Sequence, residues 1–221
     1  MDLMEAMRQR HSVRRYTDKP IPEDALHALR EEIAACSRES GLRIQLIIDE
    51  PRAFSGRMAH YGSFSGVKNY LALVGRKGPD LEERCGYYGE RLVLLAQQLG
   101  LSSCWVALTY RKVPDALEIA PGEKLAAVIA LGCGETQGVP HRSKPAGEVS
   151  NLGADSPEWF RAGVEAALLA PTAMNQQKFT LTREGNRVSA KAGLGFYTKM
   201  DLGIVKYHFE LGAGRENFKW A

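Results

Sequence analysis

Two uninterrupted apolar segments constrain the fold of this chain most. Residues 70–74 (YLALV) and 125–131 (LAAVIAL) have the length of strands and contain no charged side chain. A strand that is apolar on both of its faces must be covered on both faces, so the first segment is expected at the centre of a sheet. The longest apolar run, 125–133, is far too short to span a bilayer.

Amphipathic helical patterns alternate with strand patterns along the rest of the chain. Asp2 and Glu5 form a capping box for a short first helix, and Asp201 is expected to cap the last one, which Gly212 closes. Ser156 and Pro157 provide a similar start signal. Further helices are expected over 22–40, 86–99 and 157–168, and further strands over 43–48, 104–108 and a hairpin at 178–190.

A polar stretch rich in Gly and Pro, 132–155, is expected to be a long loop or linker. It suggests two domains, 1–150 and 151–221, although a single domain over 1–221 is also compatible with the sequence. The two halves share an outline of helix, polar loop, strand and acidic end, with little residue identity. Chance similarity between amphipathic elements and a degenerate duplication explain this outline equally well.

Composition limits the function classes. The chain has 221 residues, of which 44% are hydrophobic, and this is ample for a buried core. A formal net charge of +3 is too small to indicate a nucleic-acid partner by itself. The N-terminus lacks the apolar region of a signal peptide, and the scattered cysteines suit a reducing compartment, so a cytoplasmic protein without a membrane partner is expected. The cysteines lack C-x-x-C spacing: Cys36, Cys85, Cys104 and Cys133.

A basic cluster follows the first helix. Arg10, Arg14 and Arg15 surround Ser12, and guanidinium groups beside a hydroxyl can bind a phosphate. His11 lies inside the cluster and can join such a site. A solvated basic helix face, or a weak nucleic-acid patch, explains the cluster alone equally simply.

Two further stretches carry polar or charged groups. Arg142 and Lys144 point to the same side of an extended chain and could grip the same phosphate, or could be ordinary loop charges. Residues 170–177 (APTAMNQQ) place several amides between a helix and a strand, and the mixed donors and acceptors of Asn and Gln match the edge of a flavin pyrimidine ring. A capped helix end with a polar loop is the simpler explanation of this stretch.

Two other candidates are set aside. The stretch 132–138 (GCGETQG) lacks the G-x-G-x-x-G spacing of a dinucleotide-binding loop. Cys104 lies in an apolar strand with no neighbouring His, so a core thiol is favoured over a nucleophile.

Together these motifs resemble the FMN-dependent nitroreductase family. Arg10-His11-Ser12-Val13-Arg14 is similar to the family's Arg-x-Ser-x-Arg/Lys signature, and 170–177 is similar to its [AS]-P-[ST]-x-x-N-x-Q motif. Lys178-Phe179 departs from the Pro-Trp that usually follows. In the usual member this second motif lies near residue 40 and reaches the flavin of the partner subunit. Here it lies in the second half, as in a divergent subgroup of the family, so the C-terminal half is expected to act as a built-in partner.

The resemblance implies a nitroreductase-like α+β fold with a central, mostly antiparallel sheet flanked by helices, and an internal pseudo-dimer of two degenerate halves is one form that this fold could take. It implies non-covalent FMN, NAD(P)H as co-substrate and a small electron-poor acceptor, in a monomer or homodimer. Dehalogenation, flavin fragmentation and non-catalytic binding of FMN or another nucleotide remain alternatives. The residues expected to take the phosphate end are Arg10, Ser12, Arg14, Arg142 and Lys144, with His11 beside them. Those expected around the flavin ring are Pro171, Thr172, Ala173 and Asn175, with the backbone of Ala107 and Leu108 near N5.

Overall fold

The computed structural model describes residues 1–221, and these form two compact units that interleave along the chain. The four-strand unit comprises Gln9–Leu81 and Leu92–Pro140. The three-strand unit comprises Met1–Arg8, Glu82–Arg91 and His141–Ala221. The expected division into 1–150 and 151–221 stays a prediction.

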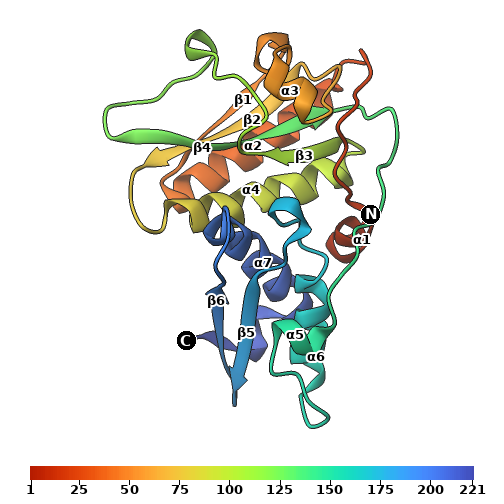
Figure 1. Cartoon of the computed structure of the whole chain (residues 1–221), viewed down its shortest axis with the longest axis vertical. Helices are drawn as coiled ribbons and strands as arrows, with labels where there is room; N and C mark the ends of the chain where they lie inside the picture. The colour runs from red at the N-terminus through yellow and green to blue at the C-terminus, as the bar shows by residue number, and fades with distance from the viewer. The chain divides into compact units, whose positions relative to one another are not determined.

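The four-strand unit contains an antiparallel sheet in the order β1-β2-β4-β3 (Figure 1). The central strands are β2 (Asn69–Arg76) and β4 (Glu123–Gly132), and the edges are β1 (Arg43–Ile47) and β3 (Ser102–Val106). All four residues from Leu71 to Val74 are fully buried, which confirms that the first apolar segment is a central strand.

Both faces of this sheet are covered. Tyr70, Ala72 and Val74 of β2 alternate onto one face, where they pack with Phe54 and Phe64. The layer that covers this face contains three short helical segments: η1 (Pro51–Phe54), α3 (Arg57–Tyr61) and η2 (Pro114–Ala116). The other face is covered by α2 (Glu23–Ser40) and the end of α4 (Leu81–Gln98) (Figure 1). These two helices form an apolar cluster with Leu131.

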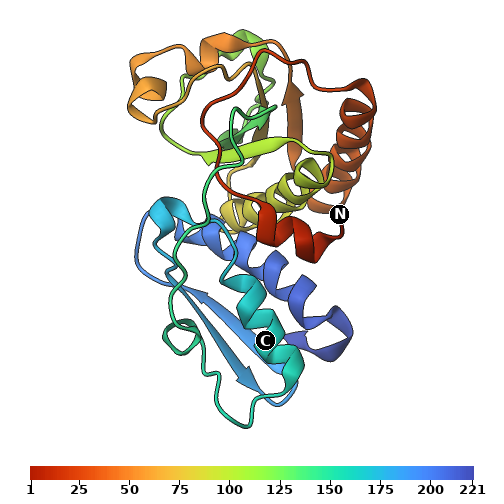
Figure 2. The same cartoon turned by 90° about the vertical axis from the view of Figure 1, so that its right-hand side faces the viewer.

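The three-strand unit is built on a hairpin. Strands β5 (Phe179–Glu184) and β6 (Arg187–Ala192) are antiparallel, and β7 (Lys219–Trp220) adds in parallel to β6. Helices α6 (Glu158–Ala167) and α7 (Thr198–Ala213) pack together beside this sheet (Figure 2). Their core is strongly aromatic, and contains Phe160, Phe209, Phe218 and Trp220. The remaining helices are α1 (Leu3–Gln9), α5 (Ala146–Val149), η3 (Ala173–Asn175) and η4 (Arg215–Asn217).

The sheet and helices confirm the expected α+β class with an antiparallel sheet flanked by helices. None of the helices has the length and apolar character needed to cross a bilayer. The degenerate repeat stays a hypothesis.

Helix α4 begins at Leu81, five residues before the expected start at Gly86. Gly86 therefore lies inside the helix. A glycine is needed at this position because α7 approaches closely: a Cβ at Gly86 would lie 2.0 Å from the carbonyl oxygen of Met200. Gly203 on α7 has the matching role, since its Cβ would lie 1.9 Å from the carbonyl oxygen of Glu83. Close helix packing, rather than a helix start, explains both glycines.

Two other sequence predictions are wrong in detail. Strand β3 covers Ser102–Val106 rather than 104–108, because Ser102 and Ser103 pair with Gly132 and Leu131 of β4. Asp201 does not cap α7. The helix begins at Thr198 after Tyr197, whose left-handed backbone (φ 58°) turns the chain, and Asp201 lies inside the first turn with 4% of its surface exposed. The helix runs through Gly212 to Ala213 and is capped by Gly214.

Candidate functional site

The basic segment lies on the edge of the four-strand sheet. After α1 the chain becomes extended, Ser12 lies opposite Ser103, and the Val13 N–H donates to the Ser103 carbonyl oxygen at 3.0 Å. The buried Tyr16 hydroxyl donates to the carbonyl oxygen of Val13 at 2.8 Å. These bonds fix the segment that carries Arg10, Ser12 and Arg14 as an added edge partner of β3.

Arg10, Ser12 and Arg14 all lie close enough to Cys104 of β3 to act on its thiol. Burial raises the pKa of the Cys104 thiol, while the charge of Arg14, a hydrogen bond with Ser12 and the charge of Arg10 act in the opposite direction. Arg10 is only 4% exposed, whereas the exposed Arg14 guanidinium lies 6.0 Å from the centre of the Phe64 ring. Cys104 itself is buried in the apolar cluster, as expected for a core thiol.

The glycine loop after β4 lies against the same segment. Gly138 has a left-handed backbone (φ 71°), and a Cβ there would lie 2.8 Å from the Cβ of His11. The Glu135 N–H donates to the Arg15 carbonyl oxygen at 2.9 Å, so the loop and the basic segment are joined. Sequence reasoning had set this stretch aside because its spacing is not that of a dinucleotide-binding loop.

Ala107 and Leu108 directly follow β3 in the same unit. Ala107 is half-buried and Leu108 is 64% exposed. Because β3 ends at Val106, neither backbone belongs to the sheet ladder, and the chain leaves the sheet at this point.

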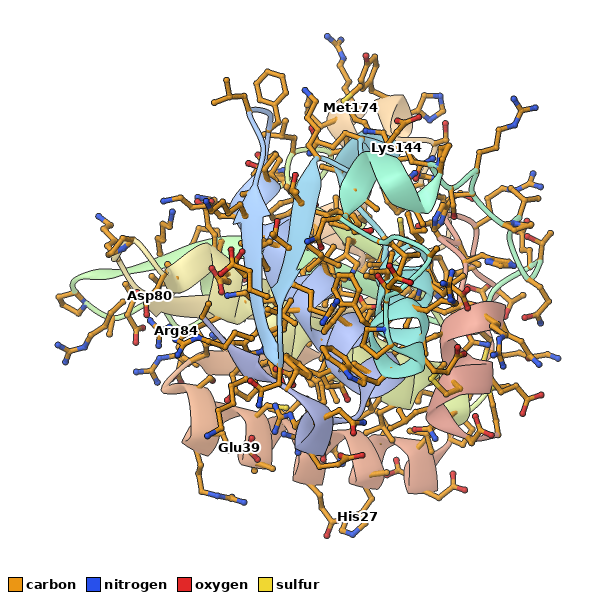
Figure 3. The ribbon with its side chains drawn as sticks, turned by 90° about the horizontal axis from the view of Figure 1, so that it is seen from below. His27, Glu39, Asp80, Arg84, Lys144 and Met174 are labelled. Carbon is orange, nitrogen blue, oxygen red and sulfur yellow. The ribbon has the colours of Figure 1, made fainter.

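The second group of candidates lies in the three-strand unit, where Arg142 and Lys144 are joined to the 171–177 loop. The Asn175 side chain and the Gln177 side chain donate to the Arg142 carbonyl oxygen, at 2.9 and 2.8 Å. The Lys144 N–H donates to Gln177 Oε1 at 2.9 Å, and its ammonium donates to the Gln177 carbonyl oxygen at 3.2 Å. Figure 3 shows Lys144 and Met174 at the same end of this unit.

The 171–177 loop is held in an unusual backbone conformation. Met174, Asn175 and Gln177 all have positive φ values, of 53°, 53° and 45°. Non-glycine residues in this region are strained, and the strain persists only where surrounding contacts over-determine it. Here the contacts include the Gln177 N–H, which donates to Thr172 Oγ1 at 3.1 Å, and the Gln177 side chain, which donates to Asn175 Oδ1 at 2.8 Å.

A buried carboxylate secures the same loop. Asp201 Oδ1 accepts from the Ala173 N–H at 2.9 Å, and Oδ2 accepts from the Gln176 side chain at 2.7 Å. Burial raises the pKa of Asp201 to about 6, and the two hydrogen bonds act in the opposite direction. The loop is therefore tied to the first turn of α7 by a carboxylate that has been largely removed from water.

The structure thus gathers the candidates into two sets, one in each unit. The four-strand unit holds Arg10, His11, Ser12, Arg14, Ala107 and Leu108, and the three-strand unit holds Arg142, Lys144, Pro171, Thr172, Ala173 and Asn175. Sequence reasoning gave Asp201 no role in the site, and it considered Gln177 only as one of the amides of 170–177 that could face a flavin. Nothing in the local sequence indicated that Gln177 would be buried, and it is 2% exposed. Asp201 was expected only to cap a helix.

Comparison with known families identifies the class. Residues 2–213 match the family described as "Putative TM nitroreductase", and the chain therefore belongs to this nitroreductase family. No curated protein matches the chain in sequence.

Solved structures share the fold. A putative nitroreductase from Thermotoga maritima is 22% identical, with a TM-score of 0.71, and the match covers 98% of this chain and 85% of that one. A putative nitroreductase from Desulfovibrio desulfuricans, solved in complex with FMN, is 22% identical with a TM-score of 0.53 and covers 71% of this chain and 98% of its own. A Parabacteroides distasonis protein described as a putative NADH dehydrogenase/NAD(P)H nitroreductase is 20% identical with a TM-score of 0.52, covering 68% and 98%.

Proposed function

We propose that this chain is an FMN-dependent oxidoreductase that passes reducing equivalents from NAD(P)H to an electron-poor acceptor such as a nitroaromatic or a quinone. Its membership of the nitroreductase family supports the class. The FMN of the Desulfovibrio structure and the NAD(P)H in the name of the Parabacteroides protein support the cofactor and the electron donor.

The grouping of Arg10, Ser12 and Arg14 near Cys104 is the observation that carries the proposal. Both guanidinium groups and the hydroxyl act on the Cys104 thiol, and the segment that carries them is fixed to the sheet edge by backbone hydrogen bonds. A phosphate group with up to two negative charges requires such a set, since Arg offers paired donors and Ser one more. These residues therefore fit the phosphate end of FMN, with Arg142 and Lys144 as the second expected grip.

The 171–177 loop is proposed to flank the flavin ring. Its Asn175 and Gln177 amides are used to hold the loop in place, so the loop would present a preset surface rather than an adaptable one. A preset surface lowers the entropy that is lost when a ligand binds. Pro171, Thr172 and Ala173 would contribute their atoms to this surface.

When bound, FMN would supply the redox chemistry, which is hydride transfer between NAD(P)H and the acceptor. The chain's own residues would bind and orient the cofactor. Arg10, Ser12 and Arg14 would hold the phosphate, the backbone at Ala107 and Leu108 would lie near N5, and Asn175 would hold its loop in place for the ring.

The setting of the protein is also proposed. All four cysteines are free thiols, and this fits a reducing compartment such as the cytoplasm. We propose that one chain completes one flavin site from its own two parts, as a monomer or within a homodimer.

The purified protein provides the first test. It should be yellow or take up added FMN, and FMN-loaded protein should oxidise NADH or NADPH when a quinone or nitroaromatic is supplied. Flavin binding without any such turnover would favour a non-catalytic flavin-binding protein. Absence of flavin binding would contradict the proposal.

A further inference from the structure

Three large apolar side chains in the three-strand unit are almost fully exposed. Met174 is 93% exposed, Leu194 94% and Phe196 76%. Met174 belongs to the loop that we propose to flank the flavin, and the other two belong to the segment that connects β6 to α7. Apolar groups that gather on adjoining loops mark an interaction surface more often than isolated ones do.

The two loops are joined to each other. The Gln176 side chain donates to the carbonyl oxygen of Phe196 at 2.7 Å, and the Gly193 N–H donates to that of Lys178 at 2.8 Å. The same Gln176 side chain also donates to Asp201, so both loops share one anchor. The backbone of the two loops that carry the exposed apolar groups is therefore held in place by these hydrogen bonds.

Lys178 lies beside these groups. The Lys178 side chain passes close to Gly195, since a Cβ at Gly195 would lie 3.1 Å from Lys178 Cδ. The residue is exposed, and its ammonium forms no ion pair in the structure. Lys178 also stands where the family's motif usually has Pro, so it is a feature of this chain rather than of the general motif.

The two loops that carry these groups, 171–178 and 193–199, have charge of one sign. They contain no Asp or Glu, and their charged side chains are Lys178 and Lys199. A ligand that covers this surface would meet apolar groups together with positive charge, and an anionic group on that ligand would be favoured.

We propose that Met174, Leu194, Phe196 and Lys178 form the acceptor site, and that the acceptor is an aromatic compound with a negatively charged substituent. The proposal rests on the proposed flavin function and specifies its substrate class. The ring of the acceptor would lie on the apolar groups, and its anionic group would pair with the Lys178 ammonium. For a nitroaromatic acceptor, two electrons and two protons from reduced flavin convert the nitro group to a nitroso group and water.

The test uses a charged and a neutral acceptor of similar shape, 4-nitrobenzoate and 4-nitrobenzamide. FMN-loaded protein is reduced without oxygen by one equivalent of dithionite, and its reoxidation by each acceptor is followed. Each rate is divided by the rate with free reduced FMN, which corrects for intrinsic reactivity. We expect a two- to fivefold preference for the carboxylate, the size of one exposed ion pair, and a decline of that preference in high salt.

Matched variants assign the preference to the lysine. Lys178→Met should abolish it and Lys178→Arg should keep it. Lys219→Met is the control, because Lys219 is an exposed lysine opposite Arg187, at the other end of the same sheet. A readout without turnover is ligand-observed NMR on flavin-free protein, where 4-nitrobenzoate should bind more tightly than 4-nitrobenzamide to the wild type and equally to Lys178→Met.

Two results overturn the inference while leaving the flavin function intact. One is an equal corrected rate for both acceptors in the wild type. The other is a dimer that Phe196→Ser converts to a monomer without changing acceptor affinity, since the surface would then cover a second copy of the chain. A protein that binds no flavin, or is reoxidised by neither acceptor, would overturn the proposed function and the inference together.

Discussion

The Asp201 carboxylate accepts a hydrogen bond from the Ala173 backbone N–H, 2.9 Å away and 28 positions earlier in the chain. A second bond, from the Gln176 side chain, makes Asp201 the anchor of the loop that is proposed to face the flavin. Because the side chain is 4% exposed, its ionised form is disfavoured by burial.

A pH dependence of stability follows from this burial. The pKa of Asp201 is raised to about 6 in the folded protein, so the folded state binds the proton more tightly than the unfolded state. Its stabilising contribution is complete below the ordinary Asp pKa and is lost as the pH rises through about 6. Between pH 4.5 and 7.5 the free energy of unfolding of the wild type should fall, relative to that of Asp201→Asn, by on the order of 2 kcal/mol.

Urea denaturation of both proteins at the two pH values measures this difference directly. The Asn variant lacks the titrating group and is the internal reference. A difference that stays constant with pH, or that grows in favour of the wild type at pH 7.5, would contradict the account.

Arg10→Ala should weaken FMN binding by about 1.5–3 kcal/mol, the scale of a hydrogen bond to a charged group. Fluorescence titration of FMN measures the affinity, and Arg8→Ala, at an exposed arginine in α1, is the control. Since Arg10 is buried, the stability of each flavin-free variant is measured separately. Unchanged affinity in both Arg10→Ala and Arg142→Ala would place the phosphate elsewhere.

Asn175→Ala should lower FMN affinity even in a strictly monomeric preparation. The substitution removes the bond to the Arg142 carbonyl oxygen and leaves an alanine in a left-handed backbone. Asn175→Gly removes the same bond without that backbone strain, so it should be more stable than Asn175→Ala but similarly impaired in binding. Normal binding by both variants in the monomer would show that the loop does not serve the flavin of its own chain.

Gly203→Ala should destabilise the fold by roughly 3 kcal/mol, the upper part of the range for overpacking, despite the higher helix propensity of alanine. The added methyl group would meet the Glu83 carbonyl oxygen, which is backbone and cannot rotate away. Gly147→Ala in α5 is the matched control: nothing lies within 4 Å of the added group, so a gain of about 0.5–1 kcal/mol is expected. Thermal unfolding distinguishes the two, and equal melting temperatures would refute the tight α4–α7 packing.

The sequence was informative where the signal was local. The segment 70–74 predicted a central strand because its apolar character alone demands burial on both faces, and Leu71 to Val74 are indeed fully buried. The Arg-x-Ser-x-Arg pattern placed its candidates within five consecutive residues, and in the structure Arg10, Ser12 and Arg14 all act on the thiol of Cys104.

Features that depend on distant elements could not be predicted in the same way. An Asp near the start of a helix has the same local pattern whether it caps that helix or binds a loop 28 positions away, and Asp201 does the latter. Gly86 was interpreted as a helix start, but a glycine is needed there because the carbonyl oxygen of Met200 on α7 leaves no room for a side chain. Long-range packing decides both cases.

The central claim, that Arg10, Ser12 and Arg14 hold the phosphate of FMN, is tested most directly by comparing FMN with riboflavin. Both are titrated into flavin-free protein under the same conditions, and the two dissociation constants are measured by flavin fluorescence. The account predicts that FMN binds at least about tenfold more tightly, because one charged hydrogen bond of about 1.4 kcal/mol already gives that ratio. Equal dissociation constants for FMN and riboflavin would contradict it.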